Sequence, residues 1–210
     1  MEKEVNLLGF KTYVLLDVSN IRSACLKSCN FRIDFIKLYD YLVSKYLNLC
    51  DVRYYEGIAH NDLQKKILFK ELGEHGYIMK PLVRRAYTDP AIMKTFVCKH
   101  CGKRNRVEAL PSETKMKSNV DVFLSAEMLK IAYEAHEPTH IILFTCDGDY
   151  AEAIKIALQN QNIVITVVAT PPIRDWKKNA LSIRLKELRK DFGKRYMLNN
   201  VNDIRDNISL

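Results

Sequence analysis

The sequence predicts an α/β protein in which a central parallel sheet is flanked by helices. Short apolar runs, typical of buried strands, alternate along the chain with longer segments whose apolar residues recur at helical spacing. This alternation of strand and helix favours right-handed crossovers, which build a parallel sheet. Apolar residues make up 48% of the 210 residues, enough material to bury both faces of such a sheet.

Each expected element follows from a local pattern. Runs rich in apolar and β-branched residues predict strands over residues 13–17, 51–57, 77–79, 140–144 and 163–168. Apolar residues three or four positions apart predict helices over residues 31–49, 61–75, 118–135, 149–159 and 177–190. Asn61 or Asp62 can cap the second helix, Gly73 and Gly76 mark its end, and Pro171 ends the last strand.

A basic segment interrupts this alternation. Residues 80–117 hold ten Lys and Arg against three Asp and Glu, and short stretches at 83–87 and 95–98 have the composition of hairpin strands. We interpret the segment as an insertion on the edge of the sheet. We therefore expect one domain over residues 1–210, with a core at about 12–170, the insertion at about 81–117 and a basic helical tail at about 171–210.

The net charge of +8 is unevenly distributed. Residues 171–195 hold nine Lys and Arg against three Asp and Glu, so the chain outside these two basic segments is net acidic. Basic surfaces beside an acidic pocket fit a polyanion that must reach metal-binding carboxylates, although solvated charged faces are the ordinary alternative. The basic residues expected to contact nucleic acid are Arg84, Arg85, Lys103, Arg104, Arg106, Lys177 and Lys178.

The sequence also indicates a cytoplasmic protein with no membrane partner. The first four residues are charged and lack the apolar stretch and cleavage site of a signal peptide. No run of about 18 uncharged apolar residues is present. Six cysteines in a chain without an export signal argue against a disulfide framework.

Four aspartates are expected to gather at the carboxyl edge of the sheet, where open α/β sheets bind ligands. Asp17 follows the first strand, Asp147 and Asp149 follow the fourth, and Asp121 lies about one turn into the third helix. Neighbouring carboxylates repel one another unless a cation compensates. Hard oxygen ligands suit Mg²⁺ or Mn²⁺, and metals held in this way promote phosphoryl chemistry.

Each acid also has an ordinary explanation. Asp17 could cap a turn, and the pairs Asp149 with Glu152 and Ser118 with Asp121 have the spacing of N-terminal capping boxes. The joint placement of the acids at one edge favours a metal site over separate caps. Dinucleotide, P-loop and zinc-peptidase sites are not expected, because their Gly-x-Gly-x-x-Gly, Gly-x-x-x-x-Gly-Lys and His-Glu-x-x-His motifs do not occur.

Three motifs, in the family's order, resemble those of NYN domains, in particular the LabA-like branch of the PIN-like nucleases. Residues 14–20, Val-Leu-Leu-Asp-Val-Ser-Asn, resemble its opening strand with Asp-x-x-Asn. Residues 117–122, Lys-Ser-Asn-Val-Asp-Val, resemble its Lys-Gly-x-Asp helix motif, and residues 145–150, Thr-Cys-Asp-Gly-Asp-Tyr, resemble Ser-Gly-Asp-Gly-Asp-Phe. The resemblance covers about residues 12–170. It implies a PIN-like fold and divalent-metal ribonuclease activity.

The resemblance also assigns roles position by position. The acidic cluster that holds Mg²⁺ or Mn²⁺ would consist of Asp17, Asp121, Asp147 and Asp149. Asn20 would order the first loop or reach a metal, Thr145 would support the cluster, and Lys117 could meet a phosphate or be an ordinary surface charge.

The chain departs from the family pattern at three positions without losing an acid. Ser19 stands where Gly or Asn is common, and Ser118 and Cys146 stand where Gly is usual. The thiol of Cys146 could crowd the site or offer a soft ligand.

Cys98 and Cys101, followed by glycine, have the spacing of a zinc half-site within the insertion. Structural zinc needs four ligands, and no second Cys-x-x-Cys follows, so the fold would have to bring in His60, His75 or Cys50. Similar inserted turns occur in some LabA-like proteins. Two free thiols and a redox pair are the alternatives to structural Zn²⁺.

The sequence therefore predicts a metal-dependent endoribonuclease that acts on single-stranded or structured RNA and, as PIN-like domains often do, could form a homodimer. One alternative is a non-catalytic nucleic-acid or protein-binding module on the same fold. Another is a nucleotide phosphohydrolase. Tyr87, Phe96 and Trp176 could stack on bases, although burial is the ordinary expectation for each.

Overall fold

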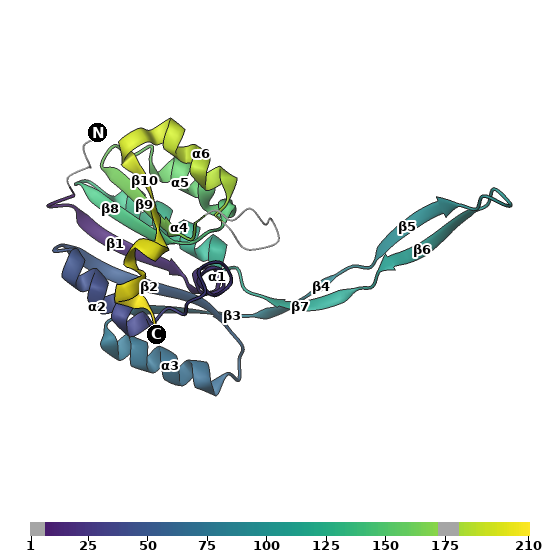
Figure 1. The fold of residues 1–210 in the computed structure, drawn as a ribbon, viewed down its shortest axis with the longest axis horizontal. Helices are drawn as coiled ribbons and strands as arrows, with labels where there is room; N and C mark the ends of the chain where they lie inside the picture. Colours follow the sequence, from purple (N-terminus) through teal and green to yellow (C-terminus); the bar gives the residue numbers. More distant parts are fainter. Residues whose placement is uncertain (1–6, 172–180) are drawn as a thin grey trace.

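A six-stranded parallel sheet forms the centre of the protein, whose computed structural model describes residues 7–171 and 181–210. Every neighbouring pair of strands is parallel, in the order β10-β9-β8-β1-β2-β3 (Figure 1). The strands are β1 (Lys11–Asp17), β2 (Leu49–Ile58), β3 (Ile78–Val83), β8 (Thr139–Phe144), β9 (Ile163–Ala169) and β10 (Tyr196–Asn200). The predicted parallel α/β sheet is confirmed.

Helices cover both faces of this sheet. They are α1 (Val18–Ala24), α2 (Phe35–Lys45), α3 (Leu63–His75), α4 (Val120–Glu134), α5 (Ala151–Ala157), α6 (Ile183–Phe192) and α7 (Arg205–Ile208). α4 packs on β1 and β2 and contacts α5, which contacts α6, whereas α2 packs on β2 and contacts α3 and α7. None of the helices in the described part of the chain is long and apolar enough to cross a membrane.

The strand order reverses between β1 and β8. From β1 the chain winds outward through β2 to β3, and from β8 it winds the other way through β9 to β10. Right-handed crossovers in opposite directions put their helices on opposite faces, which opens a crevice at the carboxyl ends of β1 and β8. Leu16 pairs with Phe144, so Asp17 and Thr145, which come next, meet at this crevice.

The central strands are buried along their length, as expected for parallel strands covered on both faces. All six residues of β8 and all seven of β9 are buried. Tyr54, Tyr150 and Tyr196 are among the largest fully buried side chains. The core therefore reaches the carboxyl edge of the sheet, where Tyr150 lies.

Several predicted helix bounds are wrong. The helix expected over residues 31–49 covers only α2, because Asp34 caps it by accepting from the amides of Ile36 and Lys37, and Leu49 already begins β2. The helix expected over residues 149–159 covers only α5, since a 3₁₀ turn occupies Gly148–Tyr150. The helix expected over residues 177–190 begins outside the described residues, and α6 starts at Ile183. Neither α1 nor β10 was predicted.

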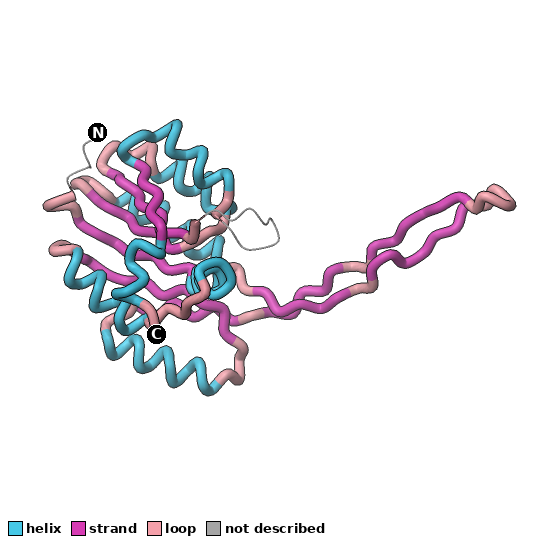
Figure 2. The backbone as a smooth tube through the Cα atoms, viewed as in Figure 1, coloured by secondary structure: helices cyan, strands magenta, loops and turns pink. Residues whose placement is uncertain are grey.

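The basic insertion forms a long two-stranded arm that leaves the sheet at the edge strand β3 (Figure 1). Near the body, β4 (Arg85–Asp89) pairs antiparallel with β7 (Glu113–Lys117). Farther out, β5 (Ile92–Val97) pairs antiparallel with β6 (Arg104–Leu110). Figure 2 shows the paired strands along the arm and the loop at its tip. The predicted hairpin insertion is confirmed, but the strands expected at residues 83–87 and 95–98 pair with β7 and β6, which were not predicted.

Gly76, which follows α3 and leads into β3, has a backbone conformation that favours glycine. Its φ is +125°, and an added Cβ would lie 2.2 Å from the Tyr39 hydroxyl oxygen. We expect Gly76→Ala to lower the free energy of unfolding by about 2 kcal/mol, as measured by urea denaturation.

Gly73→Ala is the matched control, because Gly73 lies inside α3 and an added Cβ would make only ordinary contact with Met79, at 3.6 Å. Alanine favours helix, so this variant should be more stable by roughly 0.5–1 kcal/mol. Equal effects of the two substitutions would contradict the role assigned to Gly76.

Candidate active site

Asp17 is the buried acid at the centre of the candidate site. It ends β1 and caps α1, with its carboxylate accepting from the amide of Asn20 at 3.4 Å. Two hydroxyl groups donate to its Oδ2, that of Tyr150 at 3.0 Å and that of Thr145 at 3.4 Å. The residue is only 7% exposed. Its carboxylate is thus removed from water and held by neutral donors.

The pKa of Asp17 is raised from 3.8 to about 6, chiefly by burial and to a smaller extent by the negative charge of Asp147. The hydrogen bonds from Tyr150, Asn20 and Thr145 lower the pKa and offset part of this rise. The dominant effect is the loss of hydration of the Asp17 carboxylate, which the neutral hydrogen-bond donors compensate only in part. A cation at this position would favour the ionised carboxylate.

Asp147 and Asp121 come from two other elements, and both act electrostatically on Tyr150. The amide of Asp147 donates to Thr145 Oγ1 at 3.1 Å, which fixes the chain as it leaves β8. Asp121 lies in the first turn of α4. Burial raises the pKa of the Tyr150 hydroxyl, as do the charges of Asp17, Asp121 and Asp147. Three of the four predicted acids therefore act electrostatically on one buried hydroxyl, and of these Asp17 hydrogen bonds with it.

Asp149 does not join this group. Its side chain is 71% exposed and lies 3.7 Å from the guanidinium of Arg184 in α6. The cap of the turn after β8 is Asp147, whose Oδ1 accepts from the Asp149 amide at 3.0 Å. Neither expected capping box forms, because α5 follows Tyr150 and α4 follows Asn119, and neither of these residues makes a side-chain cap.

Asn20 and Cys146 join the loops at the crevice. The side-chain oxygen of Asn20 accepts from the Cys146 amide at 2.8 Å, so the start of α1 is tied to the end of β8. The Cys146 sulfur accepts from the Thr170 amide at 3.3 Å and lies 3.3 Å from its hydroxyl. Burial raises the pKa of this thiol. Cys146 thus connects β8 to the end of β9.

Tyr150 is the residue at this site that sequence reasoning missed. It stands where the NYN motif has Phe, and that single difference adds the hydroxyl group that donates to Asp17. The replacement of Phe by Tyr is visible in the sequence. That the Tyr150 hydroxyl is buried against Asp17 is visible only in the structure.

A buried ion cluster lies beside the site and has no sequence signal. Glu56, near the end of β2, is 1% exposed and pairs with Arg22 at 3.1 Å and Lys65 at 2.5 Å. The Tyr54 hydroxyl donates to the same carboxylate at 3.1 Å. Two cations around one carboxylate leave this cluster with a net positive charge. Glu56 directly follows Tyr55, which is the partner of Asp17 in the sheet.

A groove of about 440 Å³ lies at the foot of the arm, beside the start of α4. It is lined by Leu82, Val83, Arg85, Lys117, Ser118, Asn119 and Phe123. The ammonium of Lys117 lies 4.4 Å from the centre of the Tyr87 ring. Exposed cationic and aromatic side chains therefore stand next to the first turn of α4.

The other predicted contact residues are distributed along the arm. Arg84 lies at its root, where its amide donates to the Ile58 carbonyl at 2.9 Å. Tyr87 and Phe96 are 50% and 48% exposed, so the ordinary expectation of burial is wrong for both. Arg104 and Arg106 lie in β6, and Lys103 directly precedes that strand. The remaining predicted residues, Trp176, Lys177 and Lys178, lie outside the described residues.

Cys98 and Cys101 lie at the tip of the arm, far from the acids (Figure 1). The suggested additional ligands are elsewhere: Cys50 is in β2, His60 follows β2, and His75 ends α3. Across residues 7–171 and 181–210, no three His, Cys, Asp or Glu side chains gather as a ready metal site. The fold therefore does not complete a zinc site at the tip within one chain.

The acids fit Mg²⁺ or Mn²⁺ by the chemistry of their donors. Such ions prefer carboxylate oxygens and can bind through one or two carboxylates while keeping several waters. Asp17 and Asp147 provide two carboxylates whose negative charges repel each other. This donor set suits a hydrated divalent cation, although it is not a closed cage.

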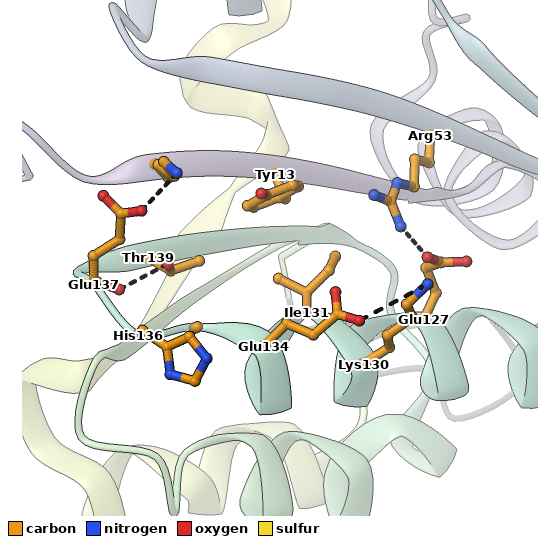
Figure 3. A pocket seen from close by; sticks show the side chains of 11 residues that line it. Tyr13, Arg53, Glu127, Lys130, Ile131, Glu134, His136, Glu137 and Thr139 are labelled. Carbon is orange, nitrogen blue, oxygen red and sulfur yellow. Dashed lines mark hydrogen bonds and ion pairs between the residues drawn. The ribbon is translucent and has the colours of Figure 1, made fainter.

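A separate pocket of about 140 Å³ lies at the opposite edge of the sheet (Figure 3). Lys11 and Thr139, which begin β1 and β8, line it. Its charges are already paired, for example Lys11 with Glu137 at 2.5 Å and Arg53 with Glu127. The length of β1 separates this pocket from Asp17.

The chain is similar to known proteins at two levels. The sequence model of the NYN domain matches residues 11–184. The crystal structure of a protein of unknown function from Vibrio parahaemolyticus RIMD 2210633 has a TM-score of 0.58 at 18% identity, over 96% of each chain. At that identity the likeness concerns the fold alone. No curated protein matches the chain.

The raised pKa of Asp17 predicts a pH-dependent effect on stability. Without divalent ions, the wild type should lose stability relative to Asp17→Asn as the pH rises from about 4 through 6, because the folded protein must then hold a buried anion. Between pH 4 and pH 8 the difference in stability should shift by up to about 3 kcal/mol in favour of the variant.

Urea unfolding at several pH values in EDTA tests this, with Asp203→Asn, at an exposed position, as the control. A difference between Asp17→Asn and the wild type that does not change with pH would contradict the assigned pKa.

Proposed function

The chain belongs to the NYN domain family, within the PIN-like nucleases, and on this premise we propose that it is a divalent-metal-dependent endoribonuclease. The observation that supports the proposal is the buried carboxylate of Asp17 at the switch point of the sheet, which accepts from Tyr150 and whose pKa the charge of Asp147 raises. We further assign the chain to the LabA-like branch, on its three motifs.

Asp17 and Asp147 would hold Mg²⁺ or Mn²⁺. Such an ion, when bound, supplies positive charge to a phosphodiester and lowers the pKa of water. Thr145 contacts both acids, since its hydroxyl donates to Asp17 and accepts from the Asp147 amide. Tyr150 donates to the same carboxylate oxygen of Asp17, Oδ2. These contacts would keep the acids in place without adding a competing cation.

RNA would approach along the foot of the arm. Arg85 and Lys117 line the groove there and can meet phosphates, while exposed Tyr87 and Phe123 can stack on unpaired bases. Asp121 lies just beyond this groove, in the first turn of α4. The basic residues farther along the arm would extend the contact. This route favours single-stranded RNA or loops, whose bases are free to stack.

Cleavage of labelled RNA tests the assignment of the acids. With Mn²⁺ or Mg²⁺ present, we expect Asp147→Asn to lower the cleavage rate at least 100-fold, because one of the two carboxylates proposed to hold the metal ion is lost. Glu152→Gln is the control, since Glu152 is exposed in α5 and pairs with Lys155. EDTA should stop cleavage by the wild type. DNA and mononucleotides are assayed in parallel.

Three outcomes would contradict the proposal. Equal RNA binding by wild type and Asp147→Asn without cleavage would indicate a non-catalytic binding module. Turnover of mononucleotides alone would indicate a nucleotide phosphohydrolase. Cleavage that persists in Asp147→Asn would place the chemistry elsewhere.

RNA binding in EDTA tests the groove separately from catalysis. We expect Lys117→Ala to weaken binding of single-stranded RNA about three- to tenfold and to reduce its salt dependence, because one phosphate contact is lost. Lys70→Ala is the matched control, as Lys70 is exposed on α3 and pairs with Glu74. Fluorescence anisotropy measures both variants. Equal affinities for the two would exclude Lys117 from the RNA path.

A further inference from the structure

The turn at the tip of the arm is shaped to present two thiols together. The Cys98 amide donates to the Lys103 carbonyl at 2.8 Å, and the Gly102 amide donates to the Cys98 carbonyl at 2.9 Å. Gly102 has a φ of +67°, which lets the chain reverse directly after Cys101. The two cysteines thus stand on one tight turn with the Cys-x-x-Cys spacing of a zinc half-site.

One chain supplies only half of a structural zinc site at this tip. Structural zinc is almost always held by four ligands, drawn from Cys and His. Every Cys and His of the sequence falls within residues 7–171 or 181–210, where no three potential ligands gather. The arm extends away from the body, so Cys98 and Cys101 are remote from the other cysteines (Figure 2). The missing ligands must come from another molecule.

The two faces of the distal part of the arm differ in their charge. Phe96 pairs with Asn105 and Lys94 with Val107, whereas Thr95 pairs with Arg106 and Val97 with Arg104. Cross-strand partners share a face, and successive residues alternate between faces. Phe96 and Val107 therefore share their face with Lys94 and Asn105 and so with a single cation, whereas the other face carries both arginines. Phe96 and Val107 are 48% and 45% exposed.

An isolated two-stranded ribbon with an exposed apolar face gains stability when that face is covered. Ile92 and Leu110 continue the apolar surface at the inner end of the ribbon, where both line one hollow. A second copy of the chain offers an identical surface and two further thiols. A twofold axis through the tip would bring four sulfurs to one point, as zinc requires.

We propose that one zinc ion joins two copies of this protein at the tips of their arms, bound by Cys98 and Cys101 of each chain. The apolar faces next to the tips pack together, and the arginine faces stay open to solvent. The bodies with the acidic sites lie at the far ends of the joined arms. This zinc site is independent of the proposed ribonuclease activity.

Zinc content and molecular mass of the purified full chain, kept reduced, test the proposal. With added Zn²⁺ we expect half an equivalent of bound zinc per chain and a mass twice the 24.4 kDa of one chain, by light scattering. A strong chelator should return the mass to that of one chain. Co²⁺ in place of Zn²⁺ should give the absorption bands of a tetrahedral four-thiolate site.

Variants separate the tip from other thiols and from the acids. The double variant Cys98→Ser, Cys101→Ser should lose both zinc and dimer, while Cys50→Ser, at an exposed thiol in the body, should keep both. Asp147→Asn should also keep both, so loss of cleavage and loss of zinc can be told apart. Unchanged thermal unfolding of the double variant shows that it is folded, since the tip lies outside the core.

Other results would overturn the proposal. One zinc per chain at the mass of a monomer would show a site completed within one chain. A dimer that persists in the double variant would show that zinc does not join the chains. A wild-type chain that stays monomeric and free of zinc under saturating Zn²⁺ would leave no role for the pair as a shared site.

Discussion

The burial of one carboxylate at the point where the strand order reverses constrains the whole site. Asp17 can lie in the core only because hydroxyl and amide donors replace part of its hydration. This requirement fixes Tyr150 inside the core and Thr145 at the end of β8. Neutral donors leave the negative charge uncompensated, so the fold keeps a position that favours a cation. Stability and proposed chemistry thus make opposite demands on the same side chain.

Sequence patterns were sufficient for the framework and insufficient for its contacts. The apolar runs and the placement of Asp17 and Asp147 after strands follow from periodicity and from the rule for open parallel sheets. Asp149 is exposed and pairs with Arg184 of α6, and no local pattern encodes that pair. The cluster around Glu56 likewise joins residues far apart in the chain. Strand β10 was missed because its sequence, Tyr-Met-Leu-Asn-Asn, is short and polar for a parallel strand.

The two ends of the molecule offer donors of different chemical hardness. Carboxylates lie at the carboxyl edge of the sheet, and thiols lie at the tip of the arm. Hard oxygen donors favour Mg²⁺ and Mn²⁺, whereas thiolates favour zinc and softer ions. With the arm separating the two donor sets, each can bind its own metal without competing for the other. The arm also places a basic strand between them, along which a polyanion could lie.

The arm affects how the protein moves through solution. A compact chain of 210 residues would have a radius of gyration of about 17 Å. A body carrying a long, thin projection experiences more friction than a sphere of equal mass, so it elutes early from a gel-filtration column and sediments slowly. A single chain can therefore imitate a dimer in elution volume. The oligomeric state of this protein must therefore be determined by a method that measures molecular mass independently of molecular shape.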